Sequence, residues 1–142
     1  MKSLPGVSNI TFNLDLLGIY FPRNERSMVG FVANAIGDRY EKDGEWTQIN
    51  WRTYSISSVL FFRDRIGKGP FMRADIGLTQ LRVDSSVTSE DTSDWGRGVL
   101  GGVGFGHPIT DGTRLLFQVN YGWRRVKGDS VGTLNLTLGG LW

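Results

Sequence analysis

Apolar and polar residues alternate along most of this chain with a period of two. Over residues 115–123 every odd position is bulky and apolar, whereas Gln118, Asn120 and Gly122 stand among the even positions. This alternation is typical of a β-strand with two unlike faces, because an amphipathic helix repeats every 3.6 residues instead. The pattern predicts seven strands and no helix, over residues 10–21, 29–36, 46–62, 72–79, 98–105, 115–123 and 131–142.

The connections between these segments are short and rich in Gly, Pro, Asn and Asp, the residues that turns require. The longest link, residues 83–94, is rich in Ser, Thr and acidic residues. Short links join strands that are neighbours in the sequence, so the chain predicts an all-β, antiparallel, up-and-down β-barrel. No domain boundary interrupts the pattern, and residues 1–142 are expected to form a single domain.

The polar face of the expected strands carries small side chains and few charges. Gly, Ser, Thr, Asn and Gln dominate it, whereas a soluble barrel should present long charged groups there. This composition favours inverted polarity, with a polar interior and an apolar outer face, as in a transmembrane barrel. The residues expected to form an interior polar network are Asp15, Asn34, Arg73, Asp75, Gln118 and Asn120.

Aromatic residues gather toward the ends of the expected strands. One group comprises Tyr20, Phe21, Phe61, Phe62, Phe105 and Trp142. The other comprises Tyr40, Trp46, Trp51, Trp95, Tyr121 and Trp123. A preference of aromatics for strands explains their number but not this clustering. The two groups therefore predict girdles at the two surfaces of a bilayer.

Composition narrows the function classes. The chain has 20 glycines in 142 residues, about twice the usual share of about 7%, which suits a narrow interior. It has no cysteine, so disulfides and thiolate metal sites are excluded. A net charge of +2 gives no indication of nucleic-acid binding. No apolar run approaches the roughly 18 residues of a membrane-spanning helix.

Catalytic chemistry finds little support in the sequence. The single histidine, His107, precedes Pro108 in an expected turn, and no cluster of histidines and carboxylates suggests a metal. The spacing of Gly96, Gly98 and Gly101 matches a dinucleotide-binding motif, but it falls in an expected strand with no following helix. The chain is therefore expected to be neither an enzyme nor a binder of cofactors or metals.

The chain resembles the small eight-stranded outer-membrane barrels of the OmpX/OmpA type. The resemblance rests on residues 91–96, residues 102–105, the strand over 115–123, and the terminal segment 131–142 with its final Trp142. It implies an integral protein of the outer membrane of a Gram-negative bacterium. The implied turn connections are short in the periplasm and longer outside.

This resemblance also implies partners. The lipid bilayer and lipopolysaccharide would surround the barrel, and the barrel-assembly machinery would recognise the C-terminal strand. The cations Arg97, Arg124, Arg125 and Lys127 lie near the expected outer rim, where they could bind lipopolysaccharide phosphates or be ordinary solvated charges. Loop 83–94 is the best candidate for contact with a surface partner.

The expected strand number is odd, whereas single-chain bacterial barrels have an even number. Three explanations for the odd number remain open. The first strand of the barrel is missing, residues 1–9 form a strand that the pattern does not reveal, or the segment 46–62 bends and forms two strands.

The expected role is structural or surface-interacting, in adhesion or host contact, with side chains plugging the lumen. A narrow channel for ions or small solutes is the first alternative, and a soluble lipocalin-like ligand-binding barrel is the second.

Overall fold

The structure is all-β. The computed structural model describes residues 8–42, 45–63, 65–86 and 91–142, and the side chains of these residues except 8–17, 42 and 91–94. Its strands are β1 (Ser8–Pro22), β2 (Ser27–Lys42), β3 (Glu45–Phe61), β4 (Gly69–Ser85), β5 (Asp91–Pro108), β6 (Arg114–Val126) and β7 (Asp129–Leu141). Within the described residues no helix is long and apolar enough to cross a membrane.

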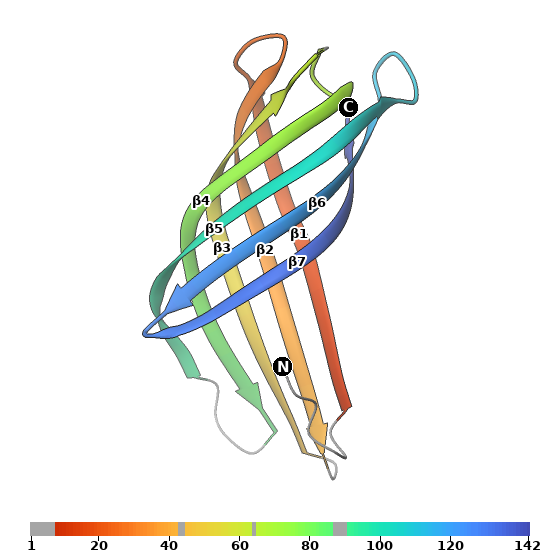
Figure 1. Ribbon diagram of the computed structural model, residues 1–142. Helices are drawn as coiled ribbons and strands as arrows, with labels where there is room; N and C mark the ends of the chain where they lie inside the picture. Colours follow the sequence, from red (N-terminus) through yellow and green to blue (C-terminus); the bar gives the residue numbers. More distant parts are fainter. Residues whose placement is uncertain (1–7, 43–44, 64, 87–90) are drawn as a thin grey trace.

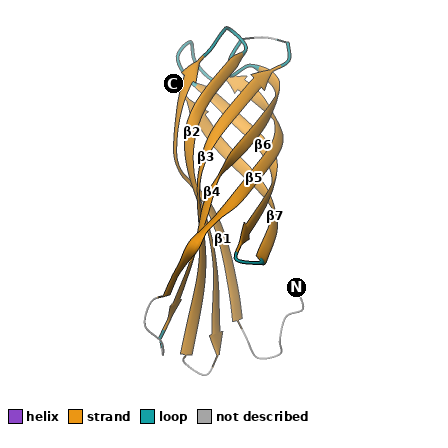
Figure 2. Ribbon diagram, turned by 90° about the vertical axis from the view of Figure 1, so that its left-hand side faces the viewer, coloured by secondary structure: helices purple, strands orange, loops and turns teal. Residues whose placement is uncertain are grey.

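The seven strands form one sheet in sequence order, and every neighbouring pair is antiparallel. The sheet curls into a half-barrel (Figures 1 and 2). The expected up-and-down fold with seven strands is therefore confirmed. Glu45–Phe61 pairs with β2 and β4 as one strand, so the idea that it bends and counts twice is wrong. Ser8 and Asn9 belong to β1, whereas residues 1–7 lie outside the described chain.

The half-barrel has two unlike ends. The connections β1–β2, β3–β4 and β5–β6 gather with Trp142 at one end, which we term the C-terminal mouth (Figure 1). At the opposite, N-terminal end, strand β5 pairs with β6 only from Arg97 onward, because β6 and β7 are joined at Val126–Asp129. Strands β1 to β5 therefore continue beyond the β6–β7 turn as an extension (Figure 2).

An open seam separates the two edge strands. Because β1 and β7 are both odd-numbered in an antiparallel meander, they run in the same direction. A cavity of about 590 Å³ lies at this seam, lined by residues 18–20 of β1 and 137–142 of β7 among others. Closure with antiparallel pairing throughout requires one further strand, antiparallel to both edges.

Apolar side chains lie on the outer face of the sheet. Among the described side chains, 23 large hydrophobics are exposed and eight are buried. Ile76 is 68% exposed and Leu136 is 85% exposed, although both lie in the middle of strands. Small or polar residues occupy the alternate positions and are buried, as in residues 53, 55 and 57 of β3. The apolar outer face expected from the sequence is therefore confirmed, and polar residues occupy the middle of the interior.

The interior is layered. On the inner face of β3, Trp51 is followed by three small polar residues and then by Val59 and Phe61. Phe61 joins a cluster with Met28, Val59 and Phe71 near the C-terminal mouth. Trp51 joins a second cluster with Ile36 and Val126 toward the N-terminal end. A polar middle layer therefore lies between two apolar clusters, neither of which the sequence analysis predicts.

A β-bulge in β1 changes the side-chain parity of the strand. The register with β2 shifts between Asp15 and Leu17, so that Ile19 and Phe21 face outward. Tyr20 consequently faces inward, packs against the Phe61 cluster, and its hydroxyl lies 3.1 Å from Ser57 Oγ. The expectation that Tyr20 belongs to an aromatic girdle is wrong, because the inserted residue reverses the alternation.

Candidate functional site

The middle layer of the interior contains a buried ion pair. Arg73 and Asp75 are two residues apart on β4 and therefore lie on the same face. Arg73 Nε donates to Asp75 Oδ1 at 3.0 Å, and Nη2 donates to Oδ2 at 2.7 Å. The two side chains are 5% and 4% exposed. Burial removes both charges from water, so each requires the other for compensation.

Arg124 of β6 crosses the interior. Its Nε donates to Thr53 Oγ1 of β3 at 2.8 Å, its Nη1 donates to Thr133 Oγ1 of β7 at 3.3 Å, and its Nη2 donates to Asn34 Oδ1 of β2. Thr53 Oγ1 also lies 3.0 Å from Thr79 Oγ1 of β4. One guanidinium thus links strands on opposite sides of the half-barrel and holds its curvature.

The interior position of Arg124 shows that its expected place at the outer rim is wrong. The side chain is 3% exposed, so it cannot lie at the outer rim as a lipopolysaccharide contact. Its even number gives it the same parity as Asn120, which also faces inward. Arg97, Arg125 and Lys127 are exposed, as expected. Arg97 and Arg125 are register partners on β5 and β6.

The structure buries four of the six residues expected in the polar network: Asn34, Arg73, Asp75 and Asn120. Gln118 is partly buried and lines the seam cavity together with Arg73. The backbone of Asp15 pairs with Asn34, whereas its side chain lies outside the described residues. Thr53, Ser57, Thr79 and Arg124 were missed, although their parity along the strands could have indicated them.

Little space is left in the polar layer. A cavity lined by Asn34, Thr53, Asp75 and Arg124, among others, measures about 10 Å³. That volume accommodates at most about one water molecule. Asn120 Nδ2 donates to Thr137 Oγ1 at 3.1 Å, while its Oδ1 has no hydrogen-bond partner among the described residues. The interior is therefore packed with side chains at this level.

The aromatic residues expected at the bilayer surfaces divide between the two faces. Phe62, Phe105, Trp95 and Tyr121 are at least half exposed, and Trp142 is 96% exposed. Trp123 is partly buried. Trp95 packs beside Tyr54 on the outer face, with ring centroids 6.0 Å apart. Phe61 and Trp51 lie in the interior clusters, so their expected places in the girdles are wrong.

The expected loop 83–94 is shorter than the sequence indicates. Strand β4 continues to Ser85 and β5 begins at Asp91, so the ends of this segment pair with each other as strand. Ser86 holds the end of β4 against β3, since its backbone nitrogen donates to Trp46 O at 3.0 Å. Residues 87–90 lie outside the described chain. The described part of this segment therefore belongs mainly to the ends of two paired strands.

The extension beyond the β6–β7 turn is polar. Arg82 Nε donates to Asp84 Oδ1 at 3.0 Å, and Asn50 Nδ2 donates to Asp84 Oδ2 at 3.1 Å. Arg39 lies 3.8 Å from Glu41, and its guanidinium is 5.2 Å from the Trp46 ring centroid. These groups suit contact with water, unlike the apolar band between the two ends.

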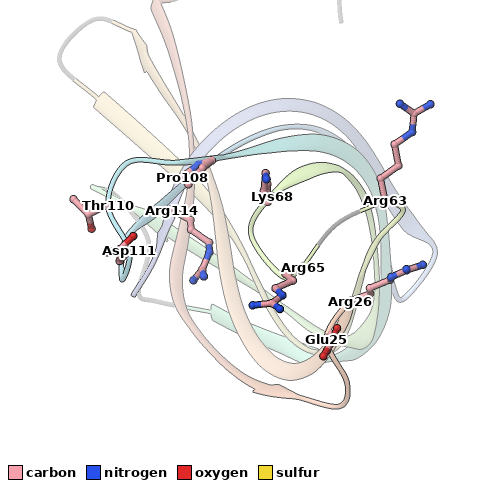
Figure 3. A pocket seen from close by; sticks show the side chains of 9 residues that line it. All are labelled: Glu25, Arg26, Arg63, Arg65, Lys68, Pro108, Thr110, Asp111 and Arg114. Carbon is pink, nitrogen blue, oxygen red and sulfur yellow. The ribbon is translucent and has the colours of Figure 1, made fainter.

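A basic pocket opens at the C-terminal mouth (Figure 3). It has a volume of about 540 Å³. Three turns line it with the cations Arg26, Arg63, Arg65, Lys68 and Arg114, the acids Glu25 and Asp111, and Pro108 and Thr110. The sequence did not indicate this pocket, because its cations come from separate connections.

The described residues offer no cluster of metal ligands. They contain no group of three or more His, Asp or Glu side chains that could hold a metal ion. His107 is exposed at the end of β5, and its backbone pairs with Leu115. No protein-family model, no curated protein and no solved structure matches this chain.

Proposed function

We propose that this chain is a small integral β-barrel of the outer membrane of a Gram-negative bacterium, similar in kind to the OmpX/OmpA type. The outward position of apolar side chains is the main support for this proposal, because 23 large hydrophobic residues are exposed on the described chain. Soluble monomers rarely expose contiguous apolar patches above a few hundred Å². In a bilayer the same face meets lipid, and the polar face lies inside.

Strand length supports the same proposal. A tilted strand needs about 9–11 residues to cross the hydrocarbon core. The seven strands have 13 to 18 residues, so each is long enough to cross, and the longer ones continue as the polar extension. The proposed partners are the bilayer itself, lipopolysaccharide near Arg97, Arg125 and Lys127, and an assembly machinery that recognises the C-terminal strand. That strand is β7, followed by Trp142.

We assign the barrel a structural or surface-interaction role, such as adhesion or host contact, in preference to conduction. The seam cavity reaches Arg73 and Gln118, but the layer at Asn34, Thr53 and Arg124 holds a cavity of only about 10 Å³, and the Ile36–Trp51–Val126 cluster lies beyond it, which favours a plugged interior. The polar extension, with residues 83–86 at the end of β4 and the start of β5 at Asp91, offers the proposed surface for a partner.

Unpaired backbone at the seam is costly in lipid, because hydrocarbon offers no hydrogen bonds. The proposal therefore requires that β1 and β7 each gain a partner in the membrane. The parity of the sheet fixes that partner as a strand antiparallel to both.

Electrophoretic mobility of heated and unheated samples tests this proposal. The protein is refolded with and without detergent micelles. A heat-dependent shift that occurs only with detergent is expected, because a closed barrel stays folded in unheated samples. A monodisperse, β-rich protein in plain buffer would contradict the membrane placement. Steady single-channel conductance in a planar bilayer would contradict a plugged barrel and would support a narrow channel instead.

A further inference from the structure

The C-terminal mouth concentrates positive charge. The pocket there is lined by five cations and two carboxylates, a net charge of +3. The whole chain has a net charge of +2, so all residues outside the pocket together carry −1. The excess of positive over negative charge is therefore concentrated at this opening, whereas cations and acids nearly balance over the rest of the chain.

These cations lack partners within the described structure. None of their side chains makes a hydrogen bond or ion pair with another described side chain, whereas Arg39, Arg73 and Arg82 each pair with an acid on their own strand. Like charges gathered in one cavity repel one another. An anion bound among them would relieve that repulsion.

The backbone around the pocket is well ordered by hydrogen bonds. In the β3–β4 turn, Ile66 N donates to Glu25 O at 2.8 Å, which ties this turn to the β1–β2 turn. Phe61 N makes a second tie, to Arg26 O at 2.8 Å. The β5–β6 turn is closed by Thr113 N, which donates to Thr110 Oγ1 at 3.0 Å.

Gly67 brings the β3–β4 turn against the β5–β6 connection. Its φ is 80°, and that of Gly69 is 78°, so both lie in the region that favours glycine. A Cβ at Gly67 would overlap the side chain of Arg114. The stem of Arg114 is thus held against the turn that carries Arg65 and Lys68. Figure 3 shows Arg65 and Arg114 pointing toward each other across the opening, whereas Arg63 points away.

We propose that this mouth pocket binds a phosphate group, carried either by a lipid headgroup or by a soluble phosphate ester. A phosphate monoester has a charge of about −1.5 to −2 at pH 7 and three strong acceptor oxygens. Arginine guanidinium groups match such oxygens with two parallel hydrogen bonds. Arg65 and Arg114 supply these forks, and Lys68 adds a third cation. The geometry of the site does not depend on the membrane placement, because the turns and the adjoining ends of β5 and β6 form it.

The test is isothermal titration of pyrophosphate into the 142-residue chain, refolded in maltoside micelles that contain no phosphate. The variant Arg65→Gln/Lys68→Gln should weaken binding about tenfold or more for each cation removed. Arg39→Gln/Arg52→Gln is the matched control, since it removes two exposed arginines toward the opposite end of β2 and β3. Its affinity should stay within about twofold of the unmodified chain.

A second variant protects the test against a folding defect. Arg114→Gln removes the other guanidinium fork without changing the β3–β4 turn, and it should weaken pyrophosphate binding about tenfold. Arg63→Gln should have a smaller effect, because Arg63 points away from the opening. The heat-dependent mobility of each variant reports whether it has folded.

The same variants distinguish the two sources of phosphate. Native mass spectrometry compares retention of phosphatidic acid with retention of phosphatidylcholine. Selective retention of phosphatidic acid that is lost in Arg65→Gln/Lys68→Gln identifies a lipid headgroup, whereas pyrophosphate binding alone identifies a soluble ester. Absence of both, or equal weakening in the matched control, overturns the proposal.

Discussion

Removal of Asp75 should strongly destabilise the fold. Asp75→Ala leaves the guanidinium of Arg73 buried at 5% exposure without its carboxylate partner. Breaking a buried pair in this way typically costs about 3–5 kcal/mol, because the surviving charge is left uncompensated. The matched control is Glu41→Ala, which removes the acid of an exposed pair, Arg39–Glu41, whose side chains are 45% and 52% exposed. That change should cost about 0–1 kcal/mol.

Urea titration followed by tryptophan fluorescence, on protein refolded in micelles, measures both changes. With a slope of about 1–3 kcal/mol per molar urea, Asp75→Ala should lower the midpoint by about 1 M or more. Arg73→Met/Asp75→Ala should recover part of the loss, since it removes the buried charge that Asp75 compensated. Equal midpoints for Asp75→Ala and Glu41→Ala would refute this reasoning and indicate that water reaches the pair.

Two further pairs of variants test the packing of the interior. Gly104→Ala should cost about 1–3 kcal/mol of unfolding free energy, because its Cβ would overlap Phe117 O and the ring of Phe71. Gly101→Ala should be nearly neutral, since nothing lies within 4 Å of its Cβ position, and equal costs in urea titrations would contradict the assigned faces. Arg124→Gln should lower the free energy of unfolding by about 1–3 kcal/mol through its lost hydrogen bonds, whereas Arg125→Gln should change it by less than about 0.5 kcal/mol. Similar effects of the two arginine substitutions would show that Arg124 does not hold the interior together.

Much of the fold follows from period-two alternation. That pattern predicted the seven strands, their order and the inward position of Asn34, Arg73, Asp75 and Asn120. These features depend only on parity within each strand, which is a local property. The Ile76 and Leu136 side chains face outward for the same reason.

Other features depend on contacts that the sequence does not reveal. The bulge between Asp15 and Leu17 adds one residue, and extending the alternation straight through it predicts the wrong face for Tyr20. The adjacent apolar residues Leu16 and Leu17, followed by Gly18, mark this change of parity in the sequence. The interior clusters join residues of different strands, and Trp51 and Phe61 have the parity of the polar residues between them. Their location could have been predicted only by extending the parity of β3 to both its ends.

Arg124 and the basic mouth pocket show the same limit of prediction from sequence. Arg124 was grouped with Arg125 because the two are neighbours in the sequence, although neighbouring residues of a strand point to opposite faces. The basic mouth pocket combines cations from three connections that are distant in the sequence. Only the register of the sheet brings those connections to one end.

Depth-resolved spin labelling tests the membrane placement most directly. The chain has no cysteine, so Ile76→Cys gives a single nitroxide on the outer face, and Asp111→Cys gives a control in an exposed turn. In phospholipid vesicles, the label at position 76 should collide readily with oxygen, which dissolves in lipid, and rarely with a water-soluble nickel chelate. Nickel collisions as frequent at position 76 as at position 111 would show that the apolar face does not lie in the bilayer.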